Sequence, residues 1–294
     1  MREDRLIQGM AAGGDFRIIA AQTTITVETA RRRHDLSPVG ADALGRAMTA
    51  AVMLARLLEK TLRNQRVTLR FDGGGPLGVV IAEGTGHGAV RGYVGNPHIG
   101  SDAREVGDAI GFHGRLTVVR GTPPLGKPYT SQIELVSGEV AKDIAQYLAT
   151  SEQIAAAVVL GVLSRPAGVA AAGGMIIQAF PHTSERAIAG LEERIRDAAP
   201  FSTLLDRMRI EEAVEVVLED LDYKAIDSRF DVPIHYRCSC TADRALAQLS
   251  LLEPYELREM IENEGGSEVV CQFCGAKYNF TPQEILTLTA PPDA

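Results

Sequence analysis

SPVGADALGRAMTAAVMLARLL, residues 37–58, is the stretch that decides the fold of this 294-residue chain. Ser37 can cap the amino end of a helix, and Pro38 fits the first helical position, where no backbone N–H is needed. From Leu44 to Leu58, apolar residues occupy most of the helical circumference. Because such a helix has no polar face to turn toward water, the stretch predicts a helix buried inside the core.

Strand-like segments stand on both sides of this helix. The segment before it, FRIIAAQTTITV (16–27), is rich in β-branched residues. After it, RVTLRF, GVVIAE and GAVRGYV (66–94) are separated by glycine-rich turns, which predicts an antiparallel meander. Further strand patterns are RLTVVR (115–120), TSQIELV (130–136), AAAVVLGVL (155–163) and GVAAAGGMIIQAF (168–180). A second helix is expected from Ser137 through VAKDIAQYLAT.

The order of these segments predicts the fold class. Strands come in runs with helices between the runs, which is typical of an α+β fold rather than a doubly wound sheet. We expect residues 1–180 to form an N-terminal domain of mixed α/β layers around the buried helix.

Residues 181–234 have a different composition. ERAIAGLEERIRDAA and IEEAVEVVLEDL are amphipathic and acidic, and Pro200 separates them. Their apolar residues form a stripe too narrow for a core of its own, so we expect helices that lie on another surface. The stripe consists of Ile188, Leu191, Ile195, Val214, Val217 and Leu218.

All four cysteines lie in the last fifth of the chain, as Cys238-Ser-Cys240 and Cys271-Gln-Phe-Cys274. Four thiolates complete the tetrahedral coordination of Zn²⁺, and a CxxC pair followed by Gly275 has the form of a zinc knuckle. We therefore predict that these four residues bind zinc in a domain spanning residues 235–294. Four free cysteines buried as small apolar residues are the weaker alternative, because chance would not pair them this way.

The size of this domain makes the metal important. A unit of about 60 residues is too small for a strongly stabilising core, whereas structural zinc contributes on the order of 10–16 kcal/mol. A disulfide within Cys238-Ser-Cys240 would need a tight turn and would be strained and labile. A static zinc scaffold and a redox switch use the same ligands, so the cysteine pattern leaves both open.

Two other classes of function receive less support. A zinc-ribbon nucleic-acid binder is disfavoured by the formal net charge of −8 and the acidic balance around the cysteines. A nucleotide-binding enzyme could use GGGPLG (73–78), but a strand-like segment follows where the fingerprint needs a helix, so we expect a hairpin turn. We find no nucleophile motif and expect no enzyme. RRRH (31–34) is typical of a solvated helix face.

Other sequence features bear on location and ligands. The amino end lacks an apolar signal region and the apolar runs are too short to cross a bilayer, so we expect a cytoplasmic protein without a membrane partner. Reduced cysteines that bind metal fit that compartment. His235 stands close to Cys238, but we expect it at the surface or behind the ligands.

Several long and irregular motifs, together with CxC and CxxC, are similar to those of a known family. The chain resembles the 33 kDa chaperonin family, bacterial redox-regulated heat-shock holdases, over nearly its whole length. One departure is His113 in GDAIGFHGRL, where a less distinctive residue is expected and no role is assigned. The motifs are RRRHDLSP, ALGRAMTAAVMLA, GGGPLGVVIAE, VRGYVGNPH, PYTSQIELVSGEV, YLATSEQ, AAGGMIIQAFP and EVVCQFCGAKYNF.

The resemblance implies a redox-regulated chaperone. Its reduced form would hold Zn²⁺ through Cys238, Cys240, Cys271 and Cys274 and be inactive. Oxidation would form the disulfides Cys238–Cys240 and Cys271–Cys274, release zinc, unfold the small domain and loosen a metastable linker over residues 181–234. The apolar stripe would then be exposed, and the protein would dimerise and hold unfolded client proteins without ATP. Clients would pass to an ATP-dependent heat-shock foldase system.

Overall fold

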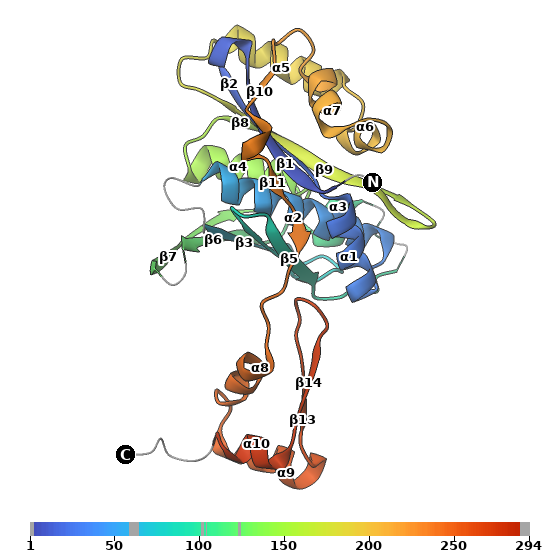
Figure 1. Cartoon of the computed structure of the whole chain (residues 1–294), viewed down its shortest axis with the longest axis vertical. Helices are drawn as coiled ribbons and strands as arrows, with labels where there is room; N and C mark the ends of the chain where they lie inside the picture. Colours follow the sequence, from blue (N-terminus) through green and yellow to red (C-terminus); the bar gives the residue numbers. More distant parts are fainter. Residues whose placement is uncertain (1–2, 59–64, 101–102, 104, 123–124, 289–294) are drawn as a thin grey trace. The chain divides into compact units, whose positions relative to one another are not determined.

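The computed structural model of the chain describes residues 3–58, 65–100, 103, 105–122 and 125–288 (Figure 1). Residues 59–60, which follow the helical stretch, residues 123–124, which lie between the strand patterns RLTVVR and TSQIELV, and residues 289–294 of the expected zinc domain lie outside this range. The chain forms two compact units, residues 1–237 and 238–294. No helix within the described ranges is long and apolar enough to cross a membrane.

The first sheet of unit 1 pairs strands that are far apart in sequence. Its order is β10-β1-β2-β9-β8, and β11 also pairs with β1. All these pairings are antiparallel, with Leu6 opposite Ala21 and Ile18 opposite Ile177. Its strands are β1 (Arg5–Ala11), β2 (Phe16–Gln22), β8 (Ala156–Arg165), β9 (Gly168–Ala179), β10 (Lys224–Ala225) and β11 (Val232–Pro233).

One sequence prediction is wrong at the end of β2. The strand pattern was expected to reach Val27, but β2 ends at Gln22 and helix α1 spans Thr24–His34. The Asp4 carboxylate accepts hydrogen bonds from the backbone N–H groups of Ile25 (3.1 Å) and Thr26 (2.6 Å). These bonds satisfy donors that a helix start otherwise leaves unpaired. A residue twenty positions earlier therefore starts the helix, against the strand preference of the local sequence.

The second sheet of unit 1 contains the predicted meander. Its order is β12-β5-β4-β3-β6-β7, and only β12 is parallel to its neighbour. The GGGPLG segment connects β3 to β4 and leads into a strand, so the hairpin turn is confirmed and the dinucleotide fingerprint is not formed. The strands are β3 (Arg66–Asp72), β4 (Val80–Thr85), β5 (Ala89–Val94), β6 (Arg115–Thr122), β7 (Leu125–Glu134) and β12 (His235–Tyr236).

Helix α2 (Pro38–Leu57) lies between the two sheets, as the apolar run predicted (Figure 1). The Ser37 hydroxyl accepts a hydrogen bond from the Gly40 N–H (3.3 Å), and Pro38 occupies the first turn. From Leu44 to Leu58 nearly every side chain is buried. Gly84 of β4 allows this strand to lie close to α2, because a Cβ there would come within 2.5 Å of the α2 backbone.

Two shorter helices, α3 (Val106–Ile110) and α4 (Ala141–Ser151), also contribute to this core. The sequence placed the start of α4 at Ser137, four residues too early. The Asp143 carboxylate accepts hydrogen bonds from the N–H groups of Val136 (2.7 Å) and Ser137 (3.1 Å). These bonds hold the residues before the helix in a turn, so the helix begins later.

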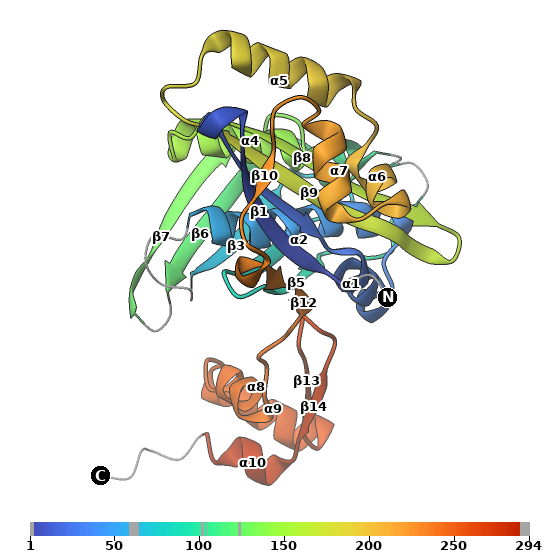
Figure 2. The ribbon, with the colours of Figure 1, turned by 45° about the horizontal axis from the view of Figure 1, so that its top comes forward.

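Three helices cover the other face of the first sheet (Figure 2). They are α5 (Glu185–Asp197), α6 (Phe201–Arg207) and α7 (Ile210–Val217), and the expected break at Pro200 is confirmed. Every member of the predicted apolar stripe is buried or partly buried in the cluster that these helices form with β1, β2 and β9. Unit 1 therefore has four layers: the second sheet, α2, the first sheet and this helical cover.

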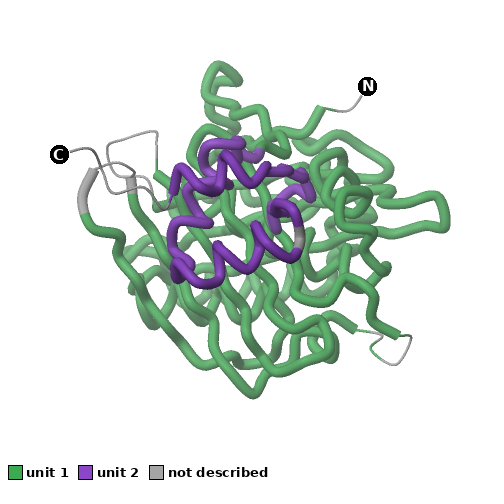
Figure 3. The backbone as a smooth tube through the Cα atoms, turned by 90° about the horizontal axis from the view of Figure 1, so that it is seen from below, with its two compact units in different colours: residues 1–237 green, residues 238–294 purple. Residues whose placement is uncertain are grey.

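Unit 2, residues 238–294, is the smaller of the two units (Figure 3). It contains α8 (Ala242–Leu249), α9 (Pro254–Glu264), β13 (Ser267–Val270), β14 (Lys277–Phe280) and α10 (Pro282–Leu286). The strands β13 and β14 form an antiparallel hairpin. The buried apolar cluster consists of Ala245, Leu249, Leu257, Phe280 and Ile285.

Candidate metal centre

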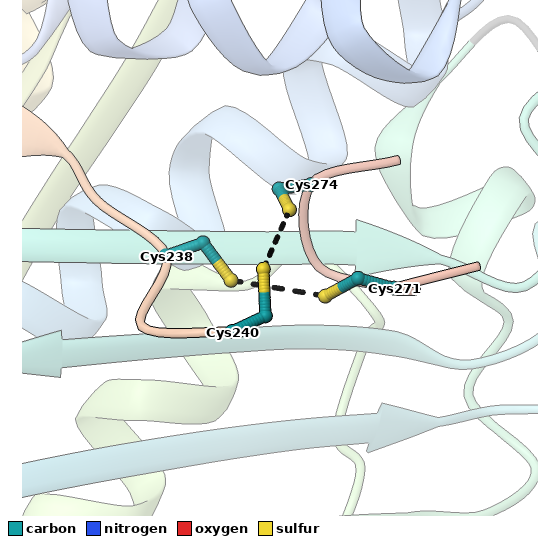
Figure 4. A group of neighbouring side chains, drawn as sticks. All are labelled: Cys238, Cys240, Cys271 and Cys274. Atoms are coloured by element: carbon teal, nitrogen blue, oxygen red, sulfur yellow. Dashed lines mark hydrogen bonds between the residues drawn. The ribbon is translucent and has the colours of Figure 1, made fainter. Parts of the chain in front are cut away.

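The four cysteines of unit 2 meet at one point (Figure 4). Cys238 and Cys240 lie on the segment before α8, and Cys271 and Cys274 lie on the turn of the β13–β14 hairpin. All four Sγ atoms are within 4.8 Å of one another. The Sγ atoms of Cys238 and Cys271 are 3.7 Å apart, and those of Cys240 and Cys274 are 3.3 Å apart. None of the four forms a disulfide in this structure.

The hairpin turn has the backbone geometry of a knuckle. The Cys271 carbonyl accepts hydrogen bonds from the N–H groups of Cys274 (3.2 Å) and Gly275 (2.8 Å), and the Cys271 N–H donates to the Ala276 carbonyl (2.9 Å). Gly275 has φ +72°, the left-handed conformation that the sequence indicated. These bonds curl the backbone so that both sulfurs face the same side.

The donor set fits a tetrahedral metal ion. With metal–sulfur bonds of about 2.3 Å, the sulfurs of a tetrahedron are about 3.8 Å apart. This value lies within the observed range, which runs from 3.3 Å to at most 4.8 Å. The cluster holds four cysteines and, among the residues that the structure describes, neither a histidine nor a carboxylate belongs to it. A set of four sulfur donors suits a thiophilic ion such as Zn²⁺.

Burial of the sulfurs disfavours their charged form in the absence of a cation. Desolvation raises the pKa of the Cys271 thiol, and it raises the pKa of Cys274 to about 12. Both groups are therefore protonated at neutral pH when no cation is nearby. Binding of a metal ion must displace these protons, so we expect metal affinity to rise with pH.

Two neighbouring side chains support the cluster, and no sequence motif assigned this role to either. The Tyr278 hydroxyl of β14 donates a hydrogen bond to the Cys240 Sγ (3.1 Å), and this bond raises the pKa of Tyr278 to about 12. Arg244 of α8 donates to the Ser239 carbonyl (2.7 Å) and hydroxyl (3.0 Å), which fixes the turn between Cys238 and Cys240. Their roles depend on tertiary contacts, which cannot be predicted from the neighbouring sequence.

The other candidate residues take no part in the cysteine cluster. His235 is exposed on β12 and does not belong to the cysteine cluster. His113 is exposed after α3, with its ring 4.4 Å from that of Phe112. In the RRRH segment, Arg31 and Arg32 form ion pairs with Glu28 at 2.7 and 2.9 Å, as expected of a helix face.

Comparisons with known proteins agree over nearly the whole chain. A family model described as Hsp33 protein matches residues 4–281. The 33 kDa chaperonin from one strain of Thermus thermophilus is 45% identical over 298 residues, which cover 97% of this chain and 86% of that protein. The 33 kDa chaperonin of Deinococcus radiodurans is 41% identical over 293 residues, which cover 96% and 97%.

A solved structure is also similar. The crystal structure of the 33 kDa chaperonin (heat shock protein 33 homolog) from Thermotoga maritima is 33% identical, has a TM-score of 0.87 and matches over 97% of both chains. The sequence resemblance and the α+β architecture are thereby confirmed. The chain belongs to the Hsp33 family.

Proposed function

We propose that this protein is a redox-regulated chaperone that holds unfolding proteins and prevents their aggregation. The observation that carries the proposal is the four-cysteine cluster in a unit whose apolar core consists of five buried side chains. Such a unit depends on its metal for folding, so oxidation of the ligands becomes a conformational signal. The relatives named 33 kDa chaperonin support the chaperone activity.

In the reduced state, Cys238, Cys240, Cys271 and Cys274 hold Zn²⁺ as thiolates. The bound ion supplies four bonds to sulfur, which keep unit 2 folded. Tyr278 and Arg244 orient the ligand turns by the hydrogen bonds described above. The covered apolar face of the first sheet keeps this state inactive.

Oxidation removes the ligands in pairs. Each pair of thiolates gives two electrons to an oxidant such as peroxide, which is reduced to water, and one S–S bond forms. The family resemblance assigns these bonds to Cys238–Cys240 and Cys271–Cys274. In the present structure, hydrogen bonds join the sulfurs of Cys238 and Cys271 (3.7 Å) and of Cys240 and Cys274 (3.3 Å), which belong to different pairs. In a tetrahedral cluster every sulfur neighbours every other, so these distances do not select the oxidised pairing.

Unfolding of unit 2 would loosen the helical cover α5–α7. We divide the chain by function into a chaperone core (1–180), a metastable linker (181–234) and a redox-switch domain (235–294). Release of α5–α7 would expose an apolar face that includes Ile18 and Met175, and a large exposed apolar surface is a binding site for unfolded chains. We further propose that the oxidised protein dimerises, acts in the cytoplasm and passes clients to an ATP-dependent foldase system.

A paired titration tests this function. Oxidant is added stepwise to the zinc-loaded protein, a chromogenic chelator reports released zinc, and suppression of a model client's aggregation is measured in the same samples. We expect both signals to rise together, and re-reduction with added Zn²⁺ to reverse both. If zinc leaves while the suppression of aggregation stays flat, the metal is a scaffold and the redox switch is wrong.

A further inference from the structure

The outer edge of β1 is closed by residues 221–234, a weakly held segment of the same chain that we call the edge cover, or in this subsection the cover. In residues 221–234, β10 and β11 contribute two residues each to the pairing. The Ile226 N–H donates to the Gln8 carbonyl (2.8 Å), and the Ile234 N–H donates to the Asp4 carbonyl (2.9 Å). Residues 224–230 are exposed, and Pro233 has no N–H to donate. The ends of this cover are packed, with Leu221 and Tyr223 against one cluster and Val232 and Ile234 against the other. Its middle has so little apolar burial that it belongs to the least stable part of unit 1.

The cover is linked to α7, which the proposed switch would release, and it ends next to the cysteine ligands. Arg5 of β1 forms ion pairs with Glu211 of α7 and with Asp231 of the cover. Tyr223 packs on Gly9, where a Cβ would come within 2.2 Å of its ring. At the far end of this segment, the Arg237 N–H donates to the Val90 carbonyl (3.0 Å), and the next residue is the cysteine ligand Cys238. Loosening from either end would therefore strip the edge of β1.

The backbone groups that would become free can be named. Asp4 and Gln8 turn their carbonyls, and Ala12 its N–H, toward the cover. The backbone N–H and C=O groups of successive strand residues point to alternate sides of the strand. Those of the even-numbered residues from Leu6 to Met10 therefore point toward the cover, and those of the odd-numbered residues point toward β2. The register agrees, because Leu6 lies opposite Val232 and Met10 opposite Lys224. Removal of the cover leaves the ladder with β2 intact.

We propose that the outer edge of β1 binds an extended segment of an unfolding protein as an added antiparallel strand. The proposal rests on the proposed function, because the cover must first be released. Strand addition uses backbone hydrogen bonds and accepts many sequences, as a chaperone for unfolded chains requires. Alternate side chains of the added strand would continue the apolar face that Ile7 and Ala11 share with β2 and β9. The edge thus selects extended chains with apolar residues at every second position.

The opposite edge of the sheet does not fit this role. Within the described ranges, no strand pairs with the outer side of β8. That edge is therefore not covered by a strand in the state that the proposal makes inactive. A binding edge that appears on activation must be closed in the present structure, and of the two edges of this sheet that condition fits the edge of β1.

Residue-resolved amide exchange of the full chain tests the proposal. Exchange is measured by NMR for the reduced zinc-loaded protein, the oxidised protein, and the oxidised protein with reduced carboxymethylated α-lactalbumin, a permanently unfolded client. We expect the outward amides of Leu6, Gln8 and Met10 to exchange about 100-fold faster after oxidation and to slow again when the client binds. The inward amides of Ile7 and Gly9 serve as controls and should stay slow throughout.

A matched pair of variants adds an independent test. Met10→Pro removes an outward N–H donor without touching the ladder to β2, whereas Met10→Ala keeps the donor. We expect oxidised M10P to bind several-fold less client than oxidised M10A, with equal zinc release. Equal client binding by two folded variants would contradict the proposal, and the exchange experiment on the unmodified chain covers the case in which M10P does not fold.

The outcomes separate this proposal from the function on which it rests. Outward β1 amides that stay protected after oxidation, or stay fast with client bound, overturn strand addition at this edge and leave the chaperone function standing. Client protection along β8 assigns binding to the other edge and also overturns it. Zinc release without any client binding overturns the proposed function itself.

Discussion

At the scale of single residues, Glu28 shows how one carboxylate ties distant parts of unit 1 together. It accepts hydrogen bonds from Arg31 (2.7 Å) and Arg32 (2.9 Å) on its own helix and from the Val169 N–H of β9 (3.0 Å). Hydrogen bonds from Arg31 lower the pKa of Glu28 from 4.5 to about 2. Its stabilising effect is complete above pH 4.5 and is lost as the pH falls toward 2.

Glu28→Gln should therefore change the dependence of stability on pH. At pH 7 we expect the variant to lose about 1–2 kcal/mol of the free energy of unfolding of unit 1, because charged hydrogen bonds become neutral ones. Below pH 4.5 the difference from the parent should shrink. Urea unfolding at pH 7, 5 and 3 measures it, with the exposed Glu193→Gln as control. A difference that stays constant across this range would contradict the assignment.

Replacement of a single metal ligand should abolish the site. Cys274→Ser removes one of four sulfurs from a cluster that offers no substitute carboxylate or histidine among the described residues. We expect zinc affinity to fall by more than about 100-fold and unit 2 to lose its folded NMR signals. Gln272→Ala, in the exposed spacer of the same turn, should bind zinc as the parent does. Full zinc content in C274S, measured by chelator competition, would rule out the four-sulfur site.

At the scale of elements, the sequence predicted the helices and turns that are determined by residues adjacent in the chain. Helix α2 has its cap and its apolar circumference in one stretch, and the cysteine turn has its glycine beside it. The start of α1 depends on Asp4, and no strand was predicted over residues 5–11, which form β1. Tyr278 lies close to Cys240 because the β13–β14 hairpin brings it there. Contacts between residues this far apart in the chain leave no local pattern.

Helix α5 offers a test of whether the helical cover α5–α7 is metastable. Gly190 lies inside this helix, and a Cβ there would meet no atom within 4 Å. Gly190→Ala should therefore stabilise α5 by about 0.5–1 kcal/mol through helix propensity alone. If release of α5–α7 limits activation, the variant should need more oxidant or a higher temperature to bind clients.

The reciprocal substitution serves as the control. Ala189→Gly, at the neighbouring exposed position, should destabilise the same helix by a similar amount and lower the activation threshold. Both variants should release zinc at the parental oxidant concentration, because neither touches unit 2. Opposite shifts in stability with an unchanged threshold for client binding would show that α5 does not control activation.

At the scale of the whole molecule, the two units are stabilised in different ways. Unit 1 has two extensive buried clusters, one around α2 between the sheets and one beneath α5–α7. Unit 2 has five buried apolar side chains and the cysteine cluster. The sequence predicted the difference from the position of its cysteines. It could not predict which strands share a sheet, because β2 pairs with β9 across about 150 residues of chain.

Removal of metal under reducing conditions should separate the two units. A chelator takes the ion without forming disulfides, so the thiols of Cys271 and Cys274 regain protons, and burial favours that neutral form. We expect unit 2 to unfold and α5–α7 to loosen while residues 1–180 keep their thermal transition, and limited proteolysis to cut first within residues 181–294. Added Zn²⁺ should restore unit 2. One common transition, shifted as a whole by the chelator, would instead show that residues 1–180 also depend on the metal.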